Sequence, residues 1–230
     1  MQRYIEACAE RSGAERLVPL LTEIISRPAL HARFVNTLAR LEYVGVRKML
    51  KSRRSESLDL DGLQHMLDET VHSLRLKKAA TALATAAGIR VPTFSDDDTL
   101  AGDAGESYLQ AIDHTAETQL HLAEVQTGST LASSSARRSE TNYLLTSAAI
   151  EVRAQVFYPI YDRLLQERGV GFSVAAITKD EDRHLAEMSA GLARATHDWR
   201  QKLEPLLLAE ERYFCEFLDA TRSAMSAQAA

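Results

Sequence analysis

The chain has 230 residues with a formal net charge of −5, and 45% of its residues are hydrophobic. This mildly acidic balance gives no basis for a nucleic-acid partner or for binding to an anionic membrane surface. No run approaches the roughly 18 apolar residues of a membrane-spanning helix, and the first residues lack the apolar stretch of a secretion signal, so we expect a cytoplasmic protein.

The whole chain has the composition and periodicity of helices. Glycine and proline are few, at 10 and 5 residues, and the apolar residues recur at helical rather than strand spacing. We therefore predict an all-α chain without strands. In chain order, the expected helices cover about 17–27, 29–53, 60–87, 106–126, 140–168, 172–194 and 198–225.

The segments between these helices are small, polar or acidic. An acidic loop is expected over 92–105 and a Ser-rich linker over 127–139. The residues expected to cap or break the helices are Ser55, Ser57, Asp59, Gly88 and Gly169–Gly171. The apolar positions expected for the helix over 60–87 are Leu63, Met66, Leu67, Leu74 and Leu76.

Two segments repeat one short motif. Asp68-Glu69-Thr70-Val71-His72 reads Asp-Glu-x-x-His, and so does Asp180-Glu181-Asp182-Arg183-His184. On a helix, residues three apart project from the same face. Each copy can therefore present a carboxylate and an imidazole to one metal ion. A single Glu-x-x-His is common by chance, whereas two copies on long helices are not.

Each motif helix is preceded by a helix with a glutamate among apolar residues. These glutamates are Glu42 and Glu151, and in antiparallel hairpins they would lie at the depth of Glu69 and Glu181 respectively. A carboxylate on an apolar helix face is unfavourable unless it is compensated. Two divalent cations between four carboxylates would compensate it. Glutamates from two helices with Glu-x-x-His from two others is the ligand pattern of di-iron and di-manganese bundles.

On these residues, about 29–195 resembles the ferritin-like di-iron carboxylate superfamily. Asp-Glu-x-Arg-His at 180–184 is similar to its oxygen-activating branch, which includes bacterial multicomponent monooxygenases and acyl carrier protein desaturases. The resemblance implies a single domain, 1–230, containing a four-helix metal-binding core, one long crossover over 89–139 and extra flanking helices such as 198–225. It also implies that Glu42, Glu69, His72, Glu151, Glu181 and His184 are metal ligands.

The resemblance gives roles to three further polar residues of the motifs. Asp68 and Asp180 would accept a hydrogen bond from the second imidazole nitrogen of a ligand histidine, which fixes the orientation of the ring. Arg183 would pair with one of these aspartates. The first motif has Val71 where the arginine would be, so the two copies need not have equivalent surroundings. The alternative for both aspartates is a solvated helix surface.

Other residues near the motifs have two interpretations each. His65, one turn before Glu69, is either a third histidine ligand or a histidine lining a pocket. Tyr158, two turns beyond Glu151, is either a redox-active or proton-donating tyrosine or a core residue. Tyr43 has the same two interpretations. Glu187 is either an additional carboxylate ligand or a solvated residue.

Two further groups have simpler explanations. His114, Glu117 and His121 share one helix face, but it lies opposite the apolar stripe, so we expect them to be solvated. Basic runs over 47–54 and 75–78 suit the C-terminal parts of their helices. Their alternative role is as a docking patch for an acidic redox partner or carrier protein.

The resulting hypothesis is a non-haem oxidase or oxygenase that uses two Fe ions, or Mn or a mixed Mn/Fe pair, to activate O2. Its partners would be O2, a small organic substrate and an electron donor such as a ferredoxin-like protein or other reductase, and it would form a possible homodimer. The first alternative is a rubrerythrin-like peroxidase or a ferroxidase, although Cys8 and Cys215 form no Cys-x-x-Cys for a rubredoxin module. The second is a non-catalytic helical interaction protein.

Overall fold

A computed structural model describes residues 1–53, 58–127 and 135–227, and these residues are helical with no strand among them. The all-α prediction is therefore confirmed for this part of the chain. The α-helices are α1 (Gln2–Ala9), α2 (Ser12–Ser26), α3 (Pro28–Ser52), α4 (Leu60–Ala86), α5 (Gly102–Thr127), α6 (Ser135–Glu167), α7 (Ala175–Ala195) and α8 (Trp199–Ala227). A short 3₁₀ turn, η2 (Asp96–Asp98), lies in the acidic loop.

The structure has more helix than the sequence predicted. Helix α1 was not expected; its Tyr4 and Cys8, one turn apart, are buried against the core. Helix α6 begins at Ser135, inside the predicted linker, because serine is only a moderately poor helix former and does not by itself end a helix. Residues 128–134 of that linker lie outside the described residues.

Several predicted helix ends are present. The Asp59 side chain accepts a hydrogen bond from the Gly62 backbone N–H at 2.9 Å and so caps α4. Gly88 follows α4 and Gly169 follows α6, with φ values of 71° and 66° that favour glycine. Ser55 and Ser57, the other expected caps, lie outside the described residues.

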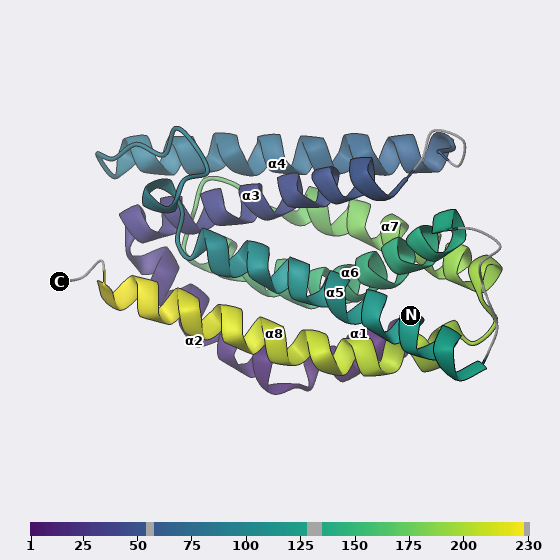
Figure 1. Cartoon of the computed structure of the whole chain (residues 1–230). Coiled ribbons are helices and arrows are strands. Elements are labelled where there is room, and N and C mark those ends of the chain that lie inside the picture. The colour runs from purple at the N-terminus through teal and green to yellow at the C-terminus, as the bar shows by residue number, and fades with distance from the viewer. Residues whose placement is uncertain (54–57, 128–134, 228–230) are drawn as a thin grey trace.

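The helices form two closely packed antiparallel pairs with further helices alongside. Helix α3 packs along α4 and α6 packs along α7, while α5 and α8 pack against each other and against α6. Figure 1 shows α4 along one outer side of the molecule and α1, α2 and α8 on the opposite side. A chain of contacts thus leads from α4 through α3 and α6 to the flanking helices.

Helix α4 buries a largely polar face and exposes several leucines, which is the reverse of an ordinary amphipathic helix. Leu63, Leu67 and Leu74, which the sequence analysis names as apolar positions of this helix, are 51%, 56% and 52% exposed. The buried face is instead mostly small or polar: Gly62, His65, Glu69, His72, Ser73, Leu76, Ala80 and Ala84. Burying polar side chains in preference to leucines is unfavourable unless those side chains have partners.

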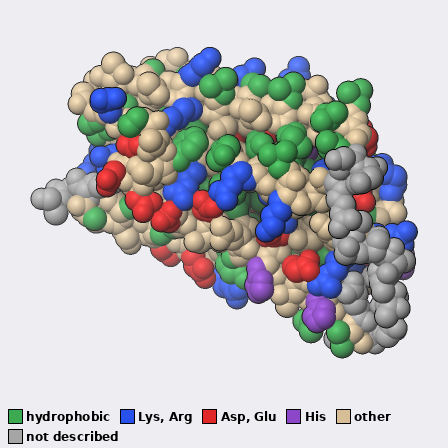
Figure 2. Space-filling view, turned by 45° about the horizontal axis from the view of Figure 1, so that its top comes forward, with side chains coloured by type: hydrophobic (Ala, Val, Ile, Leu, Met, Phe, Trp, Pro, Cys, Tyr) green, Lys and Arg blue, Asp and Glu red, His purple; other side chains and the backbone are tan. Residues whose placement is uncertain are grey.

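The surface carries acidic and basic side chains close together. On the face in Figure 2, Lys and Arg side chains lie next to Asp and Glu across the middle of the molecule. Helices α3 and α5 are joined by ion pairs, including Arg40 with Glu106 at 2.9 Å and Lys48 with Asp113. Within the described residues, no helix combines the length and apolarity needed to cross a membrane.

Candidate metal centre

Two groups of buried or half-buried side chains converge between α3, α4, α6 and α7. Within each group, one nitrogen or oxygen atom per residue lies within 4.8 Å of all the others. The first group consists of Glu42, Glu69, His72 and Glu181, and the second of His65, Glu69, Glu151 and His184. Glu69 belongs to both. These buried groups of histidine and glutamate can hold metal ions.

Helical spacing brings these side chains together. His65, Glu69 and His72 are four and three residues apart on α4, so they project from one face, as do Glu181 and His184 on α7. The remaining glutamates come from the partner helix of each pair: Glu42 from α3 and Glu151 from α6. The six residues expected as ligands and His65 thus meet at one place.

The first group is arranged around His72. Its buried Nδ1 lies 3.3 Å from Glu181 Oε1, 3.7 Å from Glu42 Oε2 and 3.9 Å from Glu69 Oε1. Among the described residues this nitrogen has no hydrogen-bond partner. A buried nitrogen that faces three carboxylates without a hydrogen bond is an unfavourable arrangement on its own. A divalent cation between these four groups would satisfy all of them, so the residues present fit a metal ion.

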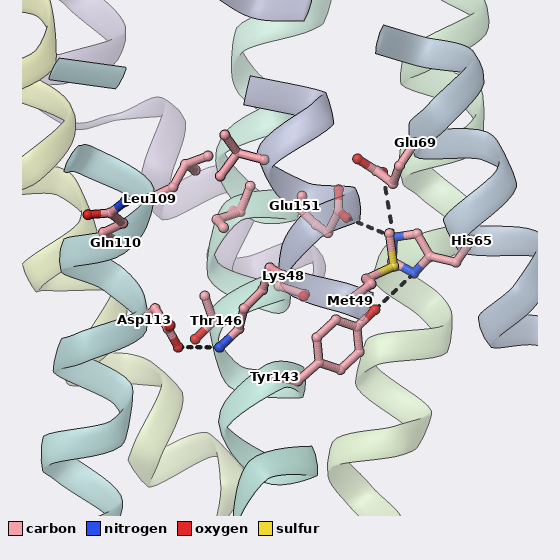
Figure 3. Close-up of a pocket in the computed structure, with 14 residues that line it drawn as sticks. Lys48, Met49, His65, Glu69, Leu109, Gln110, Asp113, Tyr143, Thr146 and Glu151 are labelled. Atoms are coloured by element: carbon pink, nitrogen blue, oxygen red, sulfur yellow. Dashed lines mark hydrogen bonds and ion pairs between the residues drawn. The ribbon is translucent and has the colours of Figure 1, made fainter. Parts of the chain in front are cut away.

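The second group is arranged around His184 and His65. The Nδ1 atom of His184 lies 2.8 Å from Glu181 Oε2 and 3.5 Å from Glu69 Oε1. Figure 3 shows His65 between the carboxylates of Glu69 and Glu151, whose Oε1 atoms lie 3.5 Å and 3.7 Å from its Nε2. The His65 ring stacks on His184 with ring centroids 3.8 Å apart. His65 Nε2 is therefore placed where it can serve as a metal ligand in the second group.

Burial and the charges of the neighbouring side chains shift the pKa of several residues of this cluster. Burial first, and neighbouring carboxylates second, raise the pKa of Glu69 and Glu151 well above the ordinary range. For Glu181, burial acts in the same direction, but the hydrogen bond with His184 and the nearby His72 ring outweigh it and lower the pKa. For His72, burial lowers the pKa, but the nearby carboxylates of Glu181 and Glu42 outweigh it and raise the pKa to about 11. Without a cation, the cluster must hold protons.

Two aspartates hold the outer nitrogens of the histidines, and each comes from the opposite helix. Asp180 Oδ2 on α7 lies 3.0 Å from Nε2 of His72 on α4. Asp68 Oδ2 on α4 lies 3.4 Å from Nε2 of His184 on α7, and Arg183 donates a hydrogen bond to the same oxygen. An N–H donated to an aspartate leaves Nδ1 with its lone pair toward the cluster, which is the tautomer that a metal ligand requires.

We expect Asp180→Asn to weaken binding of the first metal ion about tenfold or more, because losing such a partner typically costs 10–100-fold in affinity. Competition titration with a chromogenic chelator would measure this. Asp182→Asn is the matched control, since Asp182 is an exposed neighbour on the same helix. Equal affinity of the two variants would show that Asp180 does not support the ligand.

The remaining candidates separate into near and distant residues. Tyr158 is buried and donates a hydrogen bond to Glu42, and burial first, then the Glu42 carboxylate, raises its pKa well above the ordinary value. Tyr43 is 47% exposed and stacks on Phe94. Glu187 pairs with Arg183 at 3.1 Å and belongs to neither group. Tyr158 thus contacts the cluster, whereas Tyr43 and Glu187 lie outside both groups.

The structure also places residues beside the cluster that the sequence analysis missed. A Cβ atom at Gly45 would lie 3.2 Å from Glu69 Oε2, so this glycine leaves room for the shared carboxylate. The sequence signal was a glycine inside a helix, three residues after Glu42. The Tyr143 hydroxyl lies 3.4 Å from Nδ1 of His65. His114 and His121, expected to be solvated, are exposed.

Two cavities adjoin the cluster. The first, about 110 Å³, is lined by His65, Glu69 and Glu151 and, farther along, by Lys48 and Asp113 from α3 and α5. Figure 3 shows this ion pair and the pair formed by Tyr143 and His65 in different parts of the cavity. The second, about 120 Å³, is mostly apolar and is lined from α3, α4, α5, α6, α7 and α8. Helices α5 and α8, which contribute no residue to either group, thus help to form a pocket.

Comparisons with protein-family models, curated proteins and solved structures found no match to this chain. Its function must therefore be inferred from the residues of the site itself.

Proposed function

We propose that this protein is a ferritin-like di-iron oxidase or oxygenase that uses O2 to oxidise a small organic substrate. The observation that carries the proposal is the pair of four-residue groups that share Glu69, next to a mostly apolar cavity. Carboxylate and imidazole donors together suit iron, and the same donors accept manganese, so a di-manganese or mixed centre belongs to the proposal as a variant. A di-iron(II) centre would supply the electrons that reduce O2.

The chain's own residues have separate tasks in this proposal. Four glutamates offset the charge of two cations, and Glu69 lies where it can contact both. Asp68 and Asp180 fix the ligand histidines, which holds the donor geometry. Tyr158 keeps a proton next to Glu42, within reach of a ligand carboxylate. The apolar cavity walls exclude water from the place where a substrate would lie. A separate electron donor would restore the reduced centre.

The cavity favours an organic substrate over the alternative of a peroxidase or ferroxidase. An iron-handling protein needs a polar route for ions, whereas the second cavity is lined largely by Leu, Ile, Phe and Tyr side chains. Both groups contain a histidine, whereas the ferroxidase site of ordinary ferritins has only one, and this difference also favours an oxidase or oxygenase. A non-catalytic interaction protein would have no need for seven converging ligand atoms.

The test is metal content followed by O2 uptake. Protein purified from cells supplied with iron, or with manganese, should contain about two transition-metal ions per chain. The double variant Glu69→Ala, Glu181→Ala should contain none. Reduced, iron-loaded protein should consume O2 with an oxygen electrode, and the variant should not. The matched control is Glu187→Gln, which alters a carboxylate outside both groups.

Three results would favour one of the alternative functions over the proposed one. Folded protein without metal under both growth conditions would exclude a metal enzyme and favour the interaction protein. Turnover of hydrogen peroxide without any organic substrate would favour the peroxidase. Uptake of many irons per chain would favour iron handling.

A further inference from the structure

The second cavity is bordered by a buried arginine whose charge is already matched. Arg153 on α6 is 3% exposed, and its Nε and Nη2 atoms donate to Glu210 on α8, each at 2.8 Å. Nη2 also donates to Glu211 at 2.6 Å, and the guanidinium lies over the Phe214 ring at 4.1 Å. Tyr108 donates to the same Glu210 at 2.7 Å. This network joins α5, α6 and α8 behind the cavity.

The remaining terminal nitrogen of this arginine makes no hydrogen bond within the described part of the chain. Nη1 of Arg153 is buried and has no hydrogen-bond partner among the described residues. The guanidinium is planar and its donors diverge, so a fork engaged with Glu210 through Nε and Nη2 directs Nη1 away from that carboxylate. Arg153 lines the second cavity. An unpaired buried donor beside a cavity is unfavourable until an acceptor reaches it.

The cavity is lined both by metal-ligand carboxylates and by Arg153. Glu151 and Arg153 are two residues apart on α6, so their side chains leave the helix on different sides, about 200° apart. Between them the wall is formed by Ile150, Ala154 and Phe157, with Leu38 and Phe217 from α3 and α8. A molecule in this cavity would have the metal-ligand carboxylates at one end and the Nη1 donor at the other.

Volume and charge limit what fits. The cavity measures about 120 Å³, and a cavity of ~150 Å³ holds benzene. The occupant therefore has on the order of five or six non-hydrogen atoms. Because Glu210 and Glu211 already face the guanidinium, a carboxylate on the occupant would meet two like charges there. The donor at Nη1 instead suits a neutral oxygen.

We propose that this cavity binds the substrate, and that the substrate is a small neutral molecule with an apolar ring or chain and one hydroxyl or carbonyl oxygen held by Arg153 Nη1. This assignment rests on the proposed function, because the occupant is a substrate only if the protein is an oxidase or oxygenase. The apolar part then lies next to the metal-ligand carboxylates, so it is the part positioned for oxidation. Arg153 acts as a specificity-determining residue.

The test is equilibrium binding to the metal-loaded protein without O2, so that no turnover occurs. The probes are 1-butanol, pentane and butanoate, which are of similar size, share a short alkyl chain and differ in the end group. Isothermal titration calorimetry should show 1-butanol binding about tenfold tighter than pentane, because one hydrogen bond to a charged group contributes at least that factor. Butanoate should bind weakest. Butanoate binding tightest, or 1-butanol and pentane binding equally, would overturn the assignment.

Two variants locate the binding. Ala154→Leu fills the cavity and should weaken all binding at least tenfold, whereas the control Ala190→Leu, at an exposed position on α7, should not. Arg153→Lys keeps a positive charge beside Glu210 but removes the planar fork, so 1-butanol should lose its advantage over pentane. Unchanged binding in Ala154→Leu would overturn the assignment even if Arg153→Lys failed to fold.

The outcome is distinguishable from failure of the proposed function. Binding of 1-butanol as expected, with no O2-dependent oxidation of any bound molecule, would support the assignment of the cavity and exclude the oxidase. If an anionic substrate were oxidised with O2 at the same rate in the parent and in Ala154→Leu, the oxidase would be supported and the assignment of the cavity as its substrate site would be overturned.

Discussion

Replacing Glu69 by glutamine is expected to remove both metal ions at once. Glu69 is the residue that the two described groups share, and its Oε1 lies 3.5 Å from Nδ1 of His184 and 3.9 Å from Nδ1 of His72. Glutamine keeps the shape but loses the charge, so neither cation would retain its shared carboxylate. Metal analysis by mass spectrometry should fall from about two ions per chain to well below one.

The other glutamates provide the comparison. Glu42→Gln affects the first group and Glu151→Gln the second, so each should lose one ion and keep the other. A graded result of this kind would not arise from general destabilisation, because all three substitutions remove one buried carboxylate of the same size. If Glu69→Gln kept both ions while Glu42→Gln lost both, the assignment of the shared ligand would be wrong.

Metal binding is expected to raise the melting temperature strongly. A ligand at 1,000 times its dissociation constant stabilises the folded state by about 4 kcal/mol per site. For a chain of this size, each kcal/mol raises Tm by roughly 2–4 °C. One occupied site should therefore raise Tm by about 8–16 °C, and two should raise it further. Scanning calorimetry of chelator-treated protein, before and after adding ferrous iron without O2, would measure this.

In the same experiment, Glu69→Gln should raise the Tm of the metal-free protein and reduce the rise in Tm that metal causes. The metal-free variant should melt above the metal-free parent, because one of the carboxylates whose pKa is raised by burial and by its neighbours has been neutralised. Adding metal should then raise its Tm far less than that of the parent. Glu187→Gln should follow the parent in both states. A parent Tm that metal leaves unchanged would argue against a metal site.

The ligand candidates could be predicted because they depend on spacing within helices. Once 60–87 and 172–194 are helices, Glu69 with His72 and Glu181 with His184 must share a face, whatever the rest of the fold does. The depth of Glu42 and Glu151 followed from antiparallel hairpins. The capping role of Asp59 and the ends at Gly88 and Gly169 are also local properties of the chain.

Other features depend on packing, which spacing does not determine. The apolar positions of α4 do not reveal which side of the helix is buried, because the buried face is the one that carries His65, Glu69 and His72. Arg153 looked like an ordinary charged residue, since its partner Glu210 is distant in sequence and lies on a helix whose position depends on α5 and α6. The position of α1 depends in the same way on contacts with α6.

The crossed pairs of Asp68 with His184 and His72 with Asp180 have a consequence for how the molecule assembles. Helices α4 and α7 contact each other at few places, whereas each packs extensively against its own hairpin partner. Because α4 and α7 are antiparallel, one relative position along their length satisfies both pairs, and a shift by one helical turn of about 5.4 Å breaks both together. The pairs therefore help to set the alignment of the two hairpins, together with the contacts between α3 and α6. We expect hairpin docking to be the late, alignment-limited step of folding, and stopped-flow refolding to slow when both aspartates are replaced by alanine.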